Sequence, residues 1–149
     1  MTVNQDMTGF LGRYVKDGDV VYRQGEKGKT MFVIQRGQVE LRRRDGDKEF
    51  CLATLEDGDF FGAMALFGAA ERSETAVAVG EVWVLSLQKE ALLRRINEDP
   101  SLAFRMLDKM AHRIQELESA VVALGARHAT ADPSELVRLG HGKGAATTH

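Results

Sequence analysis

Short apolar runs separated by glycine-containing turns fill residues 19–88. The runs are rich in β-branched and aromatic side chains, which are typical of strands. Glycines lie between the runs or at their ends, where turns need positive φ angles. The pattern predicts strands at residues 20–23, 31–35, 38–41, 50–53, 75–79 and 82–87.

Asp-Gly pairs indicate how these strands are connected. Asp45-Gly46 stands between two apolar runs, which is a strong local signal for a β-hairpin. The segments 17–21 and 57–61 read Asp-Gly-Asp-Val-Val and Asp-Gly-Asp-Phe-Phe, as two copies of one turn that leads into a strand. Such a repeat suits a β-roll or jelly roll, the double-stranded β-helix. We therefore expect a mainly β domain with helices at its C-terminal end.

Beyond residue 88 the apolar spacing changes to that of helices. Residues 89–97 show it first, and Asp99-Pro100 then provides an N-cap followed by proline at the first helical position. From there apolar side chains recur at alternating intervals of four and three residues, which is heptad spacing. The a positions are Leu107, Ile114 and Val121, and the d positions are Ala103, Met110, Leu117 and Leu124.

The heptad stripe allows two arrangements, because it can pack on the chain's own β domain or on a second copy. It extends further than a small roll would cover, which favours the second copy. Arg113 at g and Glu118 at the following e have the spacing of an interhelical salt bridge in a parallel pair. We expect a parallel homodimer through a long helix at residues 100–124.

Composition narrows the class of protein. The 149 residues suffice for one domain, and the formal net charge of −2 provides no field for nucleic acid. No stretch approaches the roughly 20 apolar residues of a membrane span, and the N-terminus lacks the pattern of a signal peptide. We expect a cytoplasmic protein that binds neither nucleic acid nor membrane. The single cysteine, Cys51, is expected to pack in a strand as a small apolar residue.

A metal-dependent enzyme of the cupin kind would need histidines and a glutamate on its strands. The histidines are His112, His128, His141 and His149, all within the predicted long helix or beyond it. We therefore expect no metal, no cofactor and no catalytic residue.

The most informative local motif runs from Phe61 through Gly62, Ala63, Met64, Ala65 and Leu66 to Phe67, and Arg72-Ser73 follows. Amides at the start of a helical turn favour anions, and a guanidinium group pairs well with phosphate oxygens. A lone arginine at the start of a strand is ordinarily a surface residue, but its place after this motif favours an anion site.

This motif resembles the phosphate-binding cassette of cyclic nucleotide-binding domains, which reads Phe-Gly-Glu, a few apolar residues, a short loop and Arg-Ser/Thr-Ala. The likeness extends over residues 16–124 and includes Gly25, Gly28 and Gly37 in order, with Asp57-Gly58 before the cassette. It implies an eight-stranded β-roll, a short cassette helix near residues 62–67 and a C-terminal helix that covers the pocket.

The resemblance also implies roles for individual residues. Gly62 and the amides after it would hold the phosphate, Arg72 would pair with it, and Leu52 would form an apolar wall for the base. The implied ligand is cyclic AMP, cyclic GMP or another small phosphate compound. The implied binding residues are Leu52, Phe61, Gly62, Ala63, Met64, Ala65, Arg72 and Ser73.

The sequence departs from the family pattern in three places. Ala63 replaces a glutamate that accepts a hydrogen bond from the ribose 2′-hydroxyl. The absence of this hydrogen bond implies a loss of about 10- to 150-fold in affinity. Glu74 replaces a small residue and either pairs with Arg72 or points to solvent; we expect the second. Leu117-Glu118 stands where catabolite activator proteins have a hydroxyl pair that contacts adenine.

We expect residues 1–124 to form a sensor domain with its dimer helix, and residues 125–149 to form a flexible tail. The residues after Leu124 are too few for the winged helix-turn-helix of related transcription factors. The leading hypothesis is a sensor without an attached output module, whose dimer helix is read by an unidentified partner protein. The alternative is a dimerisation or interaction module that binds no nucleotide.

Overall fold

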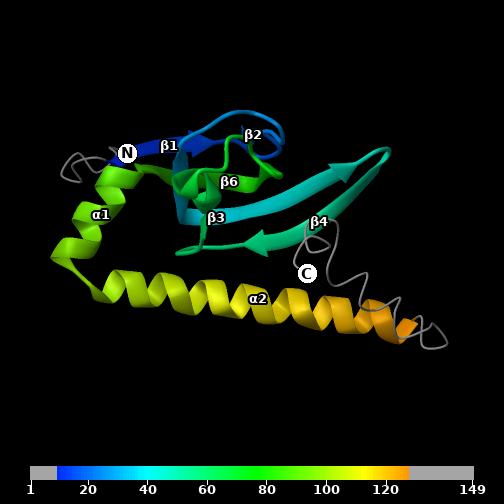
Figure 1. The fold of residues 1–149 in the computed structure, drawn as a ribbon. Helices are drawn as coiled ribbons and strands as arrows, with labels where there is room; N and C mark the ends of the chain where they lie inside the picture. Colours follow the sequence, from blue (N-terminus) through cyan, green and yellow to red (C-terminus); the bar gives the residue numbers. More distant parts are fainter. Residues whose placement is uncertain (1–9, 128–149) are drawn as a thin grey trace. The chain divides into compact units, whose positions relative to one another are not determined.

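The computed structural model describes residues 10–127. Within this range the chain forms six strands, one 3₁₀ turn and two α-helices (Figure 1). The strands are β1 (Phe10–Val15), β2 (Val20–Tyr22), β3 (Thr30–Asp45), β4 (Lys48–Leu55), β5 (Phe60–Phe61) and β6 (Thr75–Gln88). The 3₁₀ turn η1 covers Ala63–Phe67, and the helices are α1 (Lys89–Glu98) and α2 (Ser101–Arg127).

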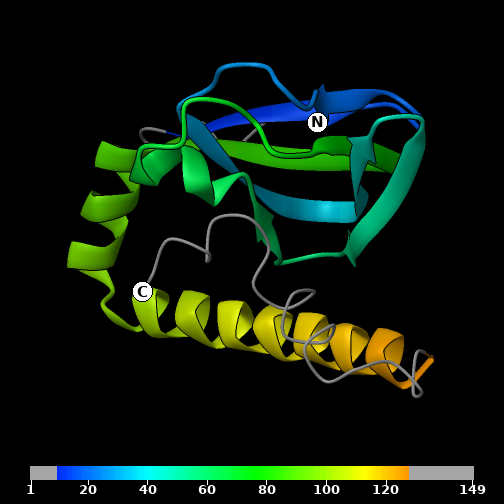
Figure 2. The ribbon, with the colours of Figure 1, turned by 45° about the vertical axis from the view of Figure 1, so that its right-hand side comes forward.

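The strands pair antiparallel throughout. The main sheet has the order β1-β6-β3-β4, with β2 added to β6 and β5 added to β3 (Figure 2). The predicted mainly β roll with C-terminal helices is confirmed. The hairpin at Asp45-Gly46 is also confirmed, because Asp45 pairs with Lys48 across it.

The two longest strands each replace two predicted ones. Residues 31–35 and 38–41 belong to the single strand β3, and residues 75–79 and 82–87 belong to β6. The prediction of separate strands is wrong because each interruption is a bend within a continuous strand, at Gly37 with φ 112° and at Gly80 with φ 72°. Counting the two halves of each long strand separately gives the eight strands that the family resemblance implies.

Both bends are held by the repeated Asp-Gly turns. Asp17 Oδ1 accepts a hydrogen bond from the Gly80 amide at 2.7 Å, and Asp57 Oδ1 accepts one from the Gly37 amide at 2.8 Å. The glycine after each aspartate donates in turn to a carbonyl of the bent strand, Gly18 to Ala78 and Gly58 to Ile34. The two segments are therefore copies of one unit, as predicted, and each unit pins the middle of one long strand.

The core lies inside the roll, along β3 and β6. Its large buried side chains include Ile34, Val39, Leu41, Val82 and Val84, all at 2% exposure or less. Strand β1 was missed by sequence reasoning, although it pairs with β6 from Phe10↔Leu87 to Val15↔Val82. Cys51 is exposed, contrary to expectation, because residues 48–51 of β4 are exposed and lie outside the core.

The helices largely follow their predicted bounds. Helix α1 confirms the helical spacing of residues 89–97, and α2 begins at Ser101, one residue after the predicted start. Helix α2 continues to Arg127, so the predicted end at Leu124 is three residues short. Gly125 does not end the helix, because one helical glycine costs only about 1 kcal/mol. The rest of the predicted tail lies outside the described residues.

The chain divides into two compact units, and the boundary falls between Pro100 and Ser101. Among the described residues, neither α1 nor α2 is long and apolar enough to cross a membrane.

Candidate functional site

The cassette of the sequence motif forms one tight turn between β5 and the loop that precedes β6. Gly62 adopts a left-handed conformation, with φ 76° and ψ 11°, and the 3₁₀ turn η1 follows it at once. Gly68, with φ 96°, ends the turn, and Leu66 anchors it in the core. The cassette helix implied by the family is thus a single 3₁₀ turn. Met64 on its outer side is 63% exposed.

Arg72 is the one charged residue among the buried side chains of the described chain, with 8% exposure. Its backbone is held by hydrogen bonds with Gly25 and Glu26, each of 2.8 Å. The alternative of an ordinary surface arginine is therefore wrong. The backbone pairing directs the side chain inward, toward the aromatic residues of the roll.

The Arg72 guanidinium group packs on aromatic rings and bonds to neutral oxygen atoms. Its Cζ lies 4.2 Å from the Tyr22 ring centroid and 5.6 Å from that of Phe32, in cation–π geometry. Nη1 donates to the Gly62 carbonyl at 3.2 Å, and Nη2 donates to Thr30 Oγ1 at 3.3 Å. The first bond is at the upper limit of the normal range and the second is slightly longer.

Two glycines leave the space that the guanidinium group occupies. A Cβ added to Gly28 would lie 2.5 Å from Nη2 of Arg72, and one added to Gly62 would lie 3.0 Å from Nη1. The spaced glycines of the sequence therefore have a steric role at this site. They let the backbone approach the arginine head from two sides.

Three aromatic rings form the floor of the site. The centroid distances among Tyr22, Phe32 and Phe61 lie between 5.4 and 5.9 Å. All three side chains are buried. Sequence reasoning named Phe61 only, because a tyrosine or phenylalanine in a strand reads as an ordinary core residue. The predicted wall residue Leu52 is half-buried and packs against the same core cluster.

Glu74 makes contacts that neither sequence hypothesis included. Its carboxylate accepts hydrogen bonds from the Tyr22 hydroxyl, at 2.6 Å, and from the Ser73 hydroxyl. The expectation that Glu74 points freely to solvent is wrong, since the side chain is half-buried and hydrogen-bonded. Its pairing with Arg72 is replaced by an indirect link, in which Tyr22 touches both side chains.

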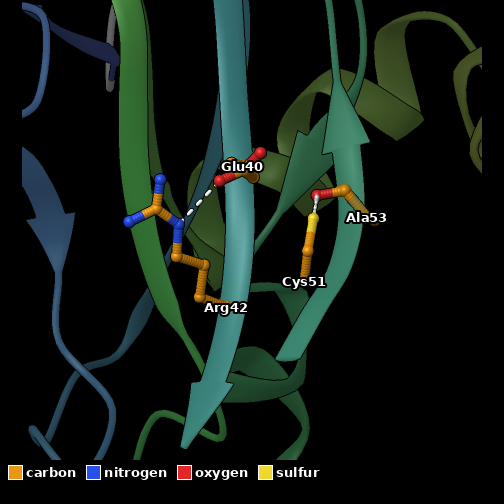
Figure 3. A network of polar contacts seen from close by, with 4 residues as sticks. All are labelled: Glu40, Arg42, Cys51 and Ala53. Carbon is orange, nitrogen blue, oxygen red and sulfur yellow. Dashed lines mark hydrogen bonds and ion pairs between the residues drawn. The ribbon is translucent and has the colours of Figure 1, made fainter. Parts of the chain in front are cut away.

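Further arginines lie on the neighbouring β3–β4 hairpin. Figure 3 shows Arg42 beside Glu40 on β3, with Nε and Oε1 2.6 Å apart, and Cys51 beside Ala53 on β4. The hydrogen bond with Glu40 raises the pKa of Arg42 above its ordinary value. Arg43 instead reaches the cassette, where its Nε donates to the Ser73 carbonyl at 2.9 Å.

The site thus brings together seven of the eight predicted residues by direct contact or sequence adjacency: Phe61, Gly62, Ala63, Met64, Ala65, Arg72 and Ser73. It adds Tyr22, Gly28, Thr30, Phe32 and Glu74. Within residues 10–127, no cluster of three histidine, cysteine or acidic side chains has the geometry to hold a metal ion.

Comparisons with known proteins agree with this architecture. The family described as the cyclic nucleotide-binding domain matches residues 12–99. The cyclic AMP receptor protein of Thermus thermophilus is 32% identical over 117 residues, which are 78% of this chain and 54% of the relative. A CRP-like cAMP-activated global transcriptional regulator of Mycobacterium tuberculosis is 28% identical over 108 residues, 72% of this chain and 48% of the relative.

The fold is also that of solved structures. The Thermus thermophilus catabolite activator protein superposes with a TM-score of 0.68 at 32% identity, covering 80% of this chain and 56% of that one. The present chain spans about half the length of these curated relatives. From the family match, the identity to this relative and the common fold, the chain belongs to the cyclic nucleotide-binding domain family.

Proposed function

We propose that this domain binds a cyclic nucleotide or a related phosphate ligand and passes the binding on through a dimer of α2 helices. The phosphate lies against residues 62–65 of the cassette and pairs with Arg72, with Ser73 as a further donor. A partner protein reads the change in the dimer. The role is regulatory rather than catalytic and is carried out in the cytoplasm, in keeping with relatives named as receptor and regulator proteins.

The observation that carries this proposal is the state of Arg72. A buried charge is costly unless it is paired, and the side-chain hydrogen bonds of this guanidinium group run to a carbonyl and a hydroxyl. A phosphate anion would provide the missing opposite charge. Charge-assisted hydrogen bonds to phosphate are shorter and roughly twice as strong as those to neutral acceptors. The guanidinium group is therefore positioned to bind an anion.

The turn after Gly62 adds backbone donors. The first amides of a helical turn have no acceptor within the turn, so they are suited to phosphate oxygens. The side chain of Ala63 offers no acceptor for a ribose hydroxyl. We therefore expect the anion to contribute most of the affinity and the sugar to contribute little.

The dimer proposal rests on α2 considered by itself. Side chains of its predicted seam are exposed: Leu107, Met110, Ile114, Leu117, Val121 and Leu124, at 39 to 62%. An apolar stripe of this length marks an interaction surface. A second copy of the helix fits it, because the stripe follows the heptad spacing of a two-stranded coiled coil.

A second candidate function is an interaction module that binds no nucleotide. Two observations favour it. Ala63 lacks the carboxylate of the family cassette, and Ser73 and Tyr22 bond to the domain's own Glu74. In this case α2 alone carries the function.

Calorimetric titration with cyclic AMP and cyclic GMP separates the two candidates. The proteins to compare are the wild type, Ala63→Glu and Arg72→Gln, with Arg36→Gln as a control that removes an exposed arginine of β3. The proposal expects binding by the wild type and the control, tighter binding by Ala63→Glu and loss in Arg72→Gln. Binding by Ala63→Glu but not by the wild type shows a pocket that has lost its nucleotide affinity through the missing glutamate. Absence of binding by both the wild type and Ala63→Glu contradicts a nucleotide site at Arg72.

A further inference from the structure

Ser73 directly follows Arg72, and its side-chain hydroxyl already forms a hydrogen bond within the domain. It donates to one carboxylate oxygen of Glu74, while the Tyr22 hydroxyl donates to the other at 2.6 Å. A serine hydroxyl has a single proton to donate. In this structure it therefore donates to a carboxylate of the same chain rather than to a ligand.

The Glu74 carboxylate also stands where its charge opposes an anion. Two cations contact its immediate neighbours: Arg72 packs on the ring of Tyr22, and Arg43 bonds to the Ser73 carbonyl. Neither guanidinium group forms an ion pair with Glu74, so the negative charge of Glu74 is not neutralised by direct pairing within the described residues. Like charges in a partly buried site repel strongly, because water screens them less than at the surface.

We propose that Glu74 is an internal competitor of the ligand and sets the affinity of the phosphate cradle, which consists of residues 62–65, Arg72 and Ser73. This inference rests on the proposed function. A phosphate that binds at Arg72 must replace Glu74 as the acceptor of the Ser73 hydrogen bond. It then lies beside the Glu74 carboxylate. Glu74 thereby restricts occupancy to high ligand concentrations, and its contact with Tyr22 couples it to the ring on which Arg72 rests.

Three variants isolate this role. Glu74→Gln keeps an acceptor for Tyr22 but removes the charge and leaves the Ser73 proton free. Glu71→Gln is the matched control, because it removes the exposed carboxylate three residues away. Ser73→Ala, made in the wild type and in Glu74→Gln, measures whether the two residues act on the ligand together.

The measurement is calorimetric titration of each purified protein with cyclic AMP, with circular dichroism to verify folding. We expect Glu74→Gln to bind about 10-fold tighter or more, because a charge-assisted bond is gained and a repulsion is lost. Glu71→Gln should bind as the wild type does. Ser73→Ala should change little in the wild type but weaken binding about 10-fold in the Glu74→Gln background.

The possible failures are distinguishable. If Glu74→Gln and the wild type bind equally, and Arg72→Gln abolishes binding in both, the proposed function stands and the competitor role is wrong. If Ser73→Ala weakens both backgrounds equally, Glu74 does not hold the Ser73 proton and the inference is overturned. If neither protein binds cyclic AMP or cyclic GMP, the proposed function and this inference both fail.

Discussion

The Arg72 guanidinium group lies over the ring of Tyr22, with Cζ 4.2 Å from the ring centroid. The two residues are separated by 50 positions in the sequence, and the pairing of β2 with β6 brings their segments together. Glu74 holds the same tyrosine through its hydroxyl. Tyr22 thus connects the buried arginine with the neighbouring carboxylate, through its ring and its hydroxyl.

Substitutions at Tyr22 should separate its two contacts. Tyr22→Phe removes the bond to Glu74 but keeps the ring, and we expect a loss of about 1 kcal/mol in the free energy of unfolding. Tyr22→Leu also removes the cation–π contact and the aromatic packing, with an expected loss of about 2–4 kcal/mol. Urea denaturation measures both values. Equal losses would show that the ring does not stabilise the buried arginine.

Gly28→Ala should affect the ligand site more than the fold. The new Cβ would lie 2.5 Å from Nη2 of Arg72, which is the end of a flexible side chain and can move aside. We therefore expect retained folding by circular dichroism and clearly weakened binding of cyclic AMP by calorimetry. Unchanged affinity would mean that the observed place of the guanidinium group is not the one that the ligand needs.

The position of the candidate site could be predicted from the sequence because its main residues are close together in the chain. Phe61, Gly62 and Arg72 belong to one spaced motif, and the chemistry of glycine amides and arginine indicates an anion. The other contacts come from distant segments. Tyr22 and Thr30 have no local feature that distinguishes them from residues of an ordinary strand, so only the strand pairing reveals their role.

The strand count shows a different limit. Gly37 and Gly80 have the local signature of turns, yet each lies at a bend where the strand continues. The strands continue through these bends because Asp57 and Asp17, from other parts of the chain, accept hydrogen bonds from the glycine amides. A contact between such separate residues is not visible in the local pattern.

The two corners of the roll, which are the Asp-Gly turns at residues 17–18 and 57–58, lead to a prediction about stability. Asp17→Ala and Asp57→Ala each remove an acceptor from the amide at the bend of a long strand, and we expect each to cost about 1–2 kcal/mol of unfolding free energy. Because the two corners hold different strands, the double variant should show the sum of the two losses. Urea denaturation tests this. A double variant no less stable than either single one would show that the corners act as one unit.

The proposed dimer seam on α2 can be tested by introducing a charge. Ile114→Glu places a carboxylate at a predicted a position and should convert the dimer to a monomer in sedimentation equilibrium. Val122→Glu is the control, since Val122 is 70% exposed and lies outside the a and d positions. An unchanged mass for Ile114→Glu, or dissociation by both variants, would contradict the heptad seam.

The most direct test of the central claim is to observe the Arg72 side chain while ligand is added. Nuclear magnetic resonance of the ¹⁵N-labelled arginine side chains, assigned with Arg72→Gln and Arg36→Gln, reports each guanidinium group separately. We predict that cyclic AMP shifts the Arg72 Nε–H signal in a saturable way and leaves the Arg36 signal in place. An Arg72 signal that stays unchanged at millimolar cyclic AMP and cyclic GMP would contradict the proposed phosphate cradle.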